Sequence, residues 1–159
     1  MKKAACAVLV LTMLMLVVAF APAASAKTLK CIQTIQFNDW GVAGPNPDHT
    51  ETGYWMGTIS GALSGTVYYW ENMPDPYIVG NVMHFSEDFY IEFEDGEWVS
   101  GYDKGLWNFA TFKFRATGWI TDASENCEYL IGSKFHEEGF TTSPDVSPIV
   151  GTGTCFIGP

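Results

Sequence analysis

The fold is decided by residues 105–121, whose sequence is GLWNFATFKFRATGWIT. In an extended strand, alternate side chains of this stretch point to opposite faces. One face is wholly apolar or small and carries Ala110, Phe112, Phe114, Ala116, Gly118 and Ile120. The other face holds the cations Lys113 and Arg115 between aromatic residues. The alternation therefore predicts a long strand whose first face lies in the protein interior.

The chain beyond residue 27 has the composition of strands throughout. Aromatic and β-branched residues dominate it, glycines punctuate it, and it contains no convincing amphipathic helix. A hairpin turn is expected at residues 95–96 (Asp-Gly), and long loops at 38–52 and 137–147. The predicted strands are 28–37, 53–60, 65–71, 77–93, 97–103, 106–121, 127–136 and 148–157.

Four glycines with a regular spacing indicate how the strands assemble. Gly53, Gly57, Gly61 and Gly65 recur at every fourth position, where a sheet bends sharply or coils closed. About eight strands in one small domain then predict an all-β fold, an eight-stranded antiparallel β-barrel. A sandwich of two sheets is the structural alternative.

Residues 1–26 have the features of an export signal. Two lysines precede an almost wholly apolar run over residues 4–21, and residues 24–26 (Ala-Ser-Ala) form an A-x-A cleavage site. A retained membrane anchor is the alternative. We predict a signal peptide at 1–26 and a single domain at 27–159, secreted or periplasmic and free of the membrane after cleavage.

The charge balance limits the classes of partner. The 159 residues include 8 Lys and Arg against 18 Asp and Glu, which gives a formal net charge of −10. Such a chain has no basic surface to neutralise phosphates, so nucleic acid is excluded as a partner. At the same time 47% of the residues are hydrophobic, which is enough for a packed core and not typical of a disordered acidic tail.

The cysteines agree with export. Cys6 lies in the predicted signal, and Cys31, Cys127 and Cys155 remain, so at most one disulfide can form within the chain. We favour Cys31–Cys155, because it would join the first strand of the mature chain to the last. Cys127–Cys155 is the alternative. The remaining thiol permits a bridge between chains, and a homo-oligomer is a possible assembly.

One acidic residue interrupts the apolar face of the predicted strand 77–93. Glu87 shares that face with Met83, Phe85, Phe89, Ile91 and Phe93. A carboxyl group on an apolar face is costly unless it is neutral, hydrogen-bonded or in a wet cavity. The corresponding face of 127–136 carries Tyr129 and Ser133, which could meet Glu87 inside the barrel. The alternative is a β-bulge near 86–88 that turns Glu87 to solvent.

The remaining chemical motifs are weak. We predict no metal site, because His84 and His136 fall on faces opposite the predicted lumen and His49 lies in a loop. The acidic residues near the predicted hairpin at 95–96 are expected to be a solvated turn. The sequence has no phosphate-binding loop, dinucleotide fingerprint or nucleophile elbow, so no cofactor is predicted.

Residues 105–121 also carry a family resemblance. They resemble the G-x(n)-F-x-A-x-G-x-I strand of allene oxide cyclase-like and dirigent-like barrels, and residues 57–61 and 65–69 resemble the opening hairpin of such barrels. The resemblance extends over about residues 53–139. It implies an eight-stranded antiparallel barrel with an apolar lumen, often oligomeric, that cyclises oxidised lipids or guides radical coupling. Residues 53–57 and 65–68 also look like the opening strands of avidin or lipocalin barrels, which are calycin-like.

These observations predict an exported β-barrel that binds a small apolar or aromatic ligand in its lumen. One alternative is an allene oxide cyclase-like isomerase or cyclase, which would act on a lipid-like or polyketide-like intermediate and place Glu87 near developing charge. Another is a structural extracellular protein with a packed barrel core. The residues predicted to line the lumen are Phe85, Glu87, Phe89, Phe112, Phe114, Tyr129 and Ser133.

Overall fold

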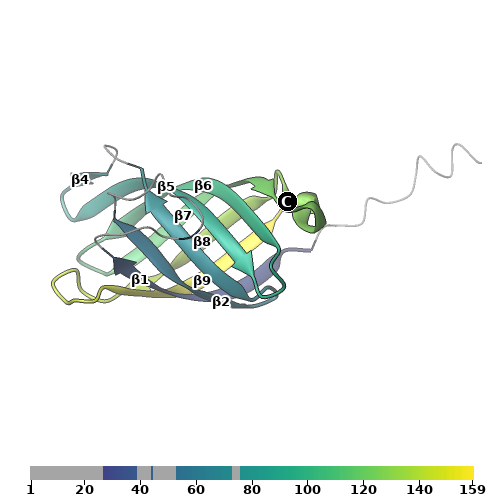
Figure 1. The fold of residues 1–159 in the computed structure, drawn as a ribbon. Coiled ribbons are helices and arrows are strands. Elements are labelled where there is room, and N and C mark those ends of the chain that lie inside the picture. Colours follow the sequence, from purple (N-terminus) through teal and green to yellow (C-terminus); the bar gives the residue numbers. More distant parts are fainter. Residues whose placement is uncertain (1–26, 39–43, 45–52, 73–75) are drawn as a thin grey trace, which may run out of the picture.

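A computed structural model describes residues 27–38, 44, 53–72 and 76–159. These residues form a closed antiparallel barrel (Figure 1), as predicted, and not a two-sheet sandwich. The signal prediction for residues 1–26 and most of the predicted loop 38–52 lie outside the described residues. The strands are β1 (Leu29–Asn38), β2 (Tyr54–Gly61), β3 (Gly65–Glu71), β4 (Tyr77–Val79), β5 (Val82–Phe93), β6 (Trp98–Asn108), β7 (Lys113–Ala123), β8 (Lys134–Thr141) and β9 (Val150–Gly158).

Eight of these strands close the ring. Their order is β3-β2-β1-β9-β8-β7-β6-β5, and pairing of β3 with β5 closes the barrel. The short strand β4 pairs with β5 outside this ring. Every pairing is antiparallel, so each strand directs alternate residues into one shared interior.

Two glycines let neighbouring strands of the barrel approach closely. A Cβ atom on Gly57 would lie 1.9 Å from the carbonyl oxygen of Thr34, and one on Gly65 would lie 2.0 Å from that of Glu92. No other residue fits at these positions without moving the backbone. Gly57 and Gly65 of the regular series thus mark close approach between strands, whereas a Cβ on Gly53 would meet the ring of Phe37 and Gly61 has φ +123°.

The two ends of the barrel are built differently. At one end lie the hairpin turn at residues 95–96, also predicted, and the 3₁₀ helix η1 (Glu125–Leu130), which buries Cys127 and Leu130 against the core (Figure 1). At the other end lie the β6–β7 turn and the segment between β8 and β9. The described residues include no helix that is long and apolar enough to cross a lipid bilayer.

Two of the predicted strands are wrong because the chain turns within each of them. Residues 77–93 form two strands, separated by Gly80 with φ +62°. Residues 106–121 contain the β6–β7 turn at 109–112, in which Phe112 has φ 58°. The backbone of Ala110 and Thr111 is bound there by the side chain of Asn108, a local bond that favours a turn over a strand.

The last third of the chain departs further from the prediction. Residues 127–136 are not a strand, because η1 occupies 125–130 and Gly132, with φ +83°, turns the chain before β8 begins. Residues 137–141, predicted as part of a loop, belong to β8. The polar run Ser-Glu-Asn-Cys-Glu at 124–128 has turn and helix-start composition, which outweighs the aromatic residues that follow it.

Candidate functional site

Three carboxyl groups meet in the middle of the barrel. Along β5 the inward residues run from Met83 and Phe85 at one end, through Glu87, to Ile91 near the hairpin end. Glu87 lies directly opposite Asp103 of β6. Glu137 reaches the same place from β8, and one carboxylate oxygen from each of the three residues lies within 4.8 Å of the others. Their side chains are buried, with exposed fractions of 4%, 0% and 2%.

The three carboxyls differ in their hydrogen bonds. Gln33 Nε2 donates to Glu137 Oε2 at 2.6 Å, and the Tyr69 hydroxyl donates to Gln33 Oε1 at 2.7 Å. Glu137 is therefore held in one orientation. Neither carboxylate oxygen of Asp103 has a hydrogen-bond partner among the described residues. No Lys or Arg of the described chain is buried, so no internal cation balances the three acids.

Burial changes the acidity of these groups. Loss of solvent raises the pKa of Glu87 and of Asp103 well above the usual carboxyl range, and the neighbouring carboxyls raise both further. Burial also raises the pKa of Glu137 to about 7, although hydrogen bonding to Gln33 and Tyr69 opposes this. In all three groups, burial therefore favours the neutral form over the carboxylate.

A cavity of about 30 Å³ adjoins the carboxyls, on the side away from η1. This volume holds about two water molecules. Aromatic rings pack around it: the centroids of Trp55 and Trp107 are 5.8 Å apart, and Trp107 Nε1 donates to Thr141 Oγ1 at 2.9 Å. The lining residues are Ile35, Trp55, Glu71, Met83, Phe85, Glu87, Trp107, Phe114, Glu137 and Thr141.

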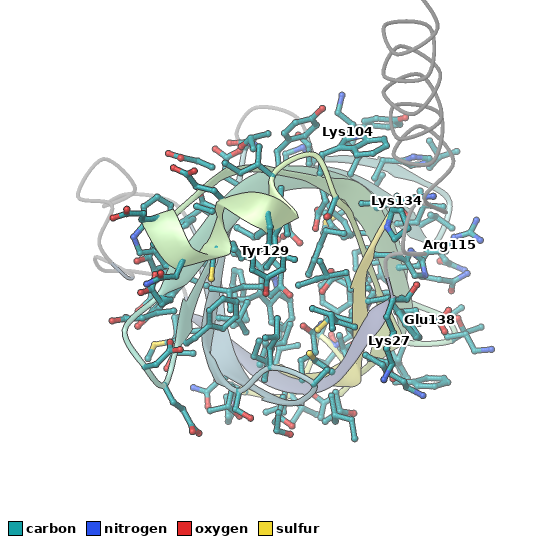
Figure 2. The ribbon with its side chains drawn as sticks, turned by 90° about the vertical axis from the view of Figure 1, so that its right-hand side faces the viewer. Lys27, Lys104, Arg115, Tyr129, Lys134 and Glu138 are labelled. Carbon is teal, nitrogen blue, oxygen red and sulfur yellow. The ribbon has the colours of Figure 1, made fainter. Side chains whose placement is uncertain are left out.

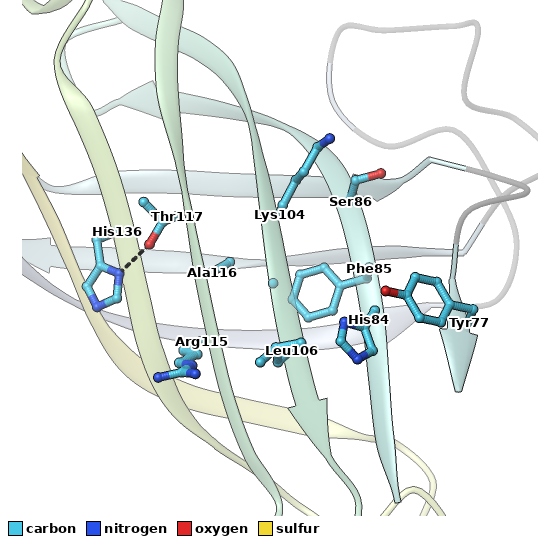
Figure 3. Close-up of a pocket in the computed structure, with 11 residues that line it drawn as sticks. Tyr77, His84, Phe85, Ser86, Lys104, Leu106, Arg115, Ala116, Thr117 and His136 are labelled. Carbon is cyan, nitrogen blue, oxygen red and sulfur yellow. Dashed lines mark hydrogen bonds between the residues drawn. The ribbon is translucent and has the colours of Figure 1, made fainter. Parts of the chain in front are cut away.

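A groove of about 630 Å³ crosses the outer face of β5–β8 (Figure 3). Phe85 lines both this groove and the internal cavity, so its ring forms part of the wall between them. The wall is thin there because Gly105 has no side chain: a Cβ at that position would lie 2.3 Å from Phe85 Cζ. The groove is otherwise lined by Tyr77, His84, Ser86, Lys104, Gly105, Leu106, Arg115, Ala116, Thr117 and His136.

The structure brings some predicted lining residues together and separates others. Phe85, Glu87 and Phe114 line the cavity. Phe89 is buried in the core, where its ring stacks on Phe135 at 4.4 Å. Phe112 is half-buried in the β6–β7 turn. The β5–β6 register runs unbroken past Glu87, so the bulge alternative is wrong.

Tyr129 and Ser133 do not meet Glu87. Tyr129 lies on η1 at the end of the barrel and is 72% exposed (Figure 2), and Ser133 lies in the connection between η1 and β8. The prediction failed because it continued strand alternation through a 3₁₀ helix. The two histidines His84 and His136 lie on the outer groove, as predicted, and His49 lies outside the described residues.

Sequence reasoning missed Asp103 and Glu137. Asp103 had a recognisable signal, because β6 places it in an inward series with Val99, Gly101 and Trp107, just as β5 places Glu87. Glu137 could be found only with the correct start of β8, since the prediction assigned it to a loop.

The structure places Cys31 and Cys155 directly opposite each other on β1 and β9, both 1% exposed. All three described cysteines are free thiols. Hydrogen bonding to Cys155 lowers the pKa of the Cys31 thiol to about 6, and the same contact and burial raise the pKa of Cys155. The Cys31–Cys155 disulfide therefore stays a prediction, now with a suitable arrangement of the two residues.

Comparison of the chain with protein-family models, curated proteins and solved structures found no match.

Proposed function

We propose that the barrel binds a small ligand in the cavity that Trp55 and Trp107 line. The ligand has an apolar or aromatic body, which packs against Trp55 and Trp107, and a polar group that reaches the carboxyls of Glu87 and Glu137. The observation that carries this proposal is the composition of the cavity, which combines aromatic walls with two buried carboxyl groups. Binding sites for small molecules commonly join an apolar wall to a few polar groups in this way.

The energetics of the barrel interior support a binding role. A barrel that serves only as a packed scaffold gains nothing from buried carboxyls, because their burial costs free energy that apolar residues would not. Ligands larger than two waters need more space than the cavity of about 30 Å³ offers. Movement of Met83 and Phe85 supplies it, since both are only half-buried and the ring of Phe85 borders the open outer groove.

The tryptophans of the cavity allow a direct test with N-phenyl-1-naphthylamine, a neutral aromatic probe. We expect the wild-type protein to bind it saturably with a rise in probe fluorescence. Trp107→Ala should weaken binding by about tenfold or more, because it removes one of the two tryptophan walls of the site; tenfold corresponds to about 1.4 kcal/mol. The matched control is Trp119→Ala, because Trp119 is 46% exposed on the outer face.

Equal affinity of the two tryptophan variants would contradict the proposal, and no probe uptake by the wild-type protein would favour a packed structural barrel. A native mass spectrum of protein purified from its own host provides a second measurement. A bound mass that is lost on denaturation would identify the ligand class. The same spectrum reports the oligomeric state.

A second candidate function is an isomerase or cyclase of the allene oxide cyclase-like kind. It is favoured by Glu87, a buried acid with a raised pKa that borders the cavity and can donate a proton or hydrogen bond to charge developing on a bound intermediate. We expect Glu87→Gln to abolish turnover of a lipid-like or polyketide-like intermediate while probe binding is retained. Unchanged turnover in this variant would rule out the role.

We also propose that the protein acts outside the cytoplasm. The support is the sequence of residues 1–26, with its basic start, apolar run and A-x-A site. N-terminal sequencing of the protein recovered from the culture medium or periplasm tests this, and a mature chain that begins at Lys27 is expected.

A further inference from the structure

We propose that Glu87, Asp103 and Glu137 together bind one divalent cation of the class that prefers oxygen ligands, with Ca²⁺ as its best representative. This inference goes beyond binding of an organic ligand and does not depend on it. It shares Glu87 and Glu137 with the proposed ligand site and adds Asp103, which does not line the cavity.

The spacing of the carboxylate oxygens admits an ion of this size. Ca²⁺ binds oxygen at 2.3–2.6 Å, so two oxygens on opposite sides of the ion are roughly 5 Å apart and others are closer. One oxygen from each of the three residues lies within 4.8 Å of the other two. The donor set consists of carboxylates alone, which suits Ca²⁺, Mg²⁺ or Mn²⁺ and not the softer metals that select thiolate or imidazole.

Asp103 supplies an independent observation that points to a ligand. Asp103 is 0% exposed, one of its carboxylate oxygens lies in the cluster, and neither oxygen has a hydrogen-bond partner among the described residues. A buried carboxyl group with no partner leaves a full desolvation cost unrecovered. Glu87, directly across the strand pair, is another acid and cannot relieve it as a carboxylate. A cation bound between the carboxyl groups of Glu87 and Asp103 satisfies both of them.

The surroundings of the cluster fit a coordinated ion. Gln33 and Tyr69 fix the orientation of Glu137 by the two hydrogen bonds described above, which is the usual role of residues behind a metal ligand. The adjoining cavity of about 30 Å³ borders Glu87 and Glu137 and has room for about two waters. Ca²⁺ takes 6–8 oxygen ligands, so waters there would complete a shell that three carboxylates begin.

Terbium luminescence tests the site on the intact protein after treatment with a chelator. Tb³⁺ replaces Ca²⁺ at oxygen sites, and it is excited by energy transfer from aromatic residues such as Tyr69, which contacts the cluster through Gln33. We expect saturable luminescence with one ion per chain, displaced by Ca²⁺. Asp103→Asn should lower the Ca²⁺ affinity, measured by titration calorimetry, by about tenfold or more.

Glu94→Gln is the matched control, because Glu94 is exposed beside the acidic hairpin turn, where Tb³⁺ could bind adventitiously. This variant should bind Ca²⁺ like the wild type. Thermal melting checks that Asp103→Asn is folded, and Glu137→Gln replaces it if it is not. Wild-type protein that binds neither ion at millimolar concentration, or binding lost in Glu94→Gln and kept in Asp103→Asn, would overturn the proposal. Uptake of the naphthylamine probe by the chelated protein tests the organic ligand in a separate measurement, so failure of the cation proposal and failure of the proposed function remain distinguishable.

Discussion

In a buffer that contains a chelator, the free energy of unfolding is expected to fall by on the order of 3 kcal/mol or more between about pH 5 and about pH 8. The cause is the buried carboxyl cluster. The pKa of Glu137 is about 7 in the folded protein, against 4.5 for an ordinary glutamate. The folded protein therefore binds more protons than the unfolded chain in this window, and its stability decreases as the pH rises.

The other groups that face the cluster act in the same direction. Glu87 and Asp103 have raised pKa values, with burial as the main cause, and so does Glu71 beside the cavity. Tyr69 also has a raised pKa, but it ionises only at more alkaline pH. The loss of stability attributable to Glu137 spans pH 4.5 to 7, and Glu87 and Asp103 extend it upward.

Urea denaturation followed by tryptophan fluorescence at several pH values measures this effect. Asp103→Asn should be more stable than the wild type at about pH 8 and should show a shallower dependence on pH, because one ionisable group has left the cluster. Glu94→Gln, in the exposed hairpin, should keep the wild-type dependence. A free energy of unfolding that does not change between pH 5 and 8 in the chelated protein would contradict a buried, metal-free carboxyl cluster.

The barrel could be predicted from the sequence because two local patterns indicate it: the alternation of residues in one strand and the spacing of glycines. The alternation of Phe114, Ala116, Gly118 and Ile120 on one face fixes which side of β7 is interior, and all four are buried. The spacing that includes Gly57 and Gly65 reports positions where strands come too close for a Cβ atom. Both patterns depend on residues near one another in the chain, so neither requires knowledge of the partner strands.

The carboxyl cluster could be predicted only in part. Glu87 was identifiable because it interrupts an apolar face, but its neighbours depend on pairing between strands that are distant in the sequence. Asp103 becomes its partner through the β5–β6 register, and Glu137 reaches it from β8, whose start the sequence pattern misplaced. The aromatic residues at 129 and 135 extended the apparent alternation across Gly132, where the backbone has a positive φ that ends it.

Oxidation is expected to join Cys31 to Cys155 and to raise the free energy of unfolding by about 4–5 kcal/mol, since the bond would close a loop of over 100 residues in the unfolded chain. Directly opposed residues of antiparallel strands have Cα atoms about 4.5–5.5 Å apart, which lies within the range that a disulfide spans. Both side chains point into the barrel. Added oxidised glutathione supplies the oxidant. The Cys31 thiolate, favoured because hydrogen bonding to Cys155 lowers the pKa of Cys31, attacks the glutathione disulfide and releases one glutathione thiolate, and Cys155 then displaces the second glutathione to close the bond.

Peptide mapping under non-reducing conditions identifies the bond, and melting with and without a reductant measures its effect. The wild type should lose stability on reduction, Cys155→Ser should be insensitive to the reductant, and Cys127→Ser should behave like the wild type. The register explains why the alternative Cys127–Cys155 bond is disfavoured: Cys127 lies on η1 rather than on a strand paired with β9, so it has no fixed position opposite Cys155. Recovery of a Cys127–Cys155 peptide would therefore mean that η1 leaves its place against β6 and β7 before the chain oxidises.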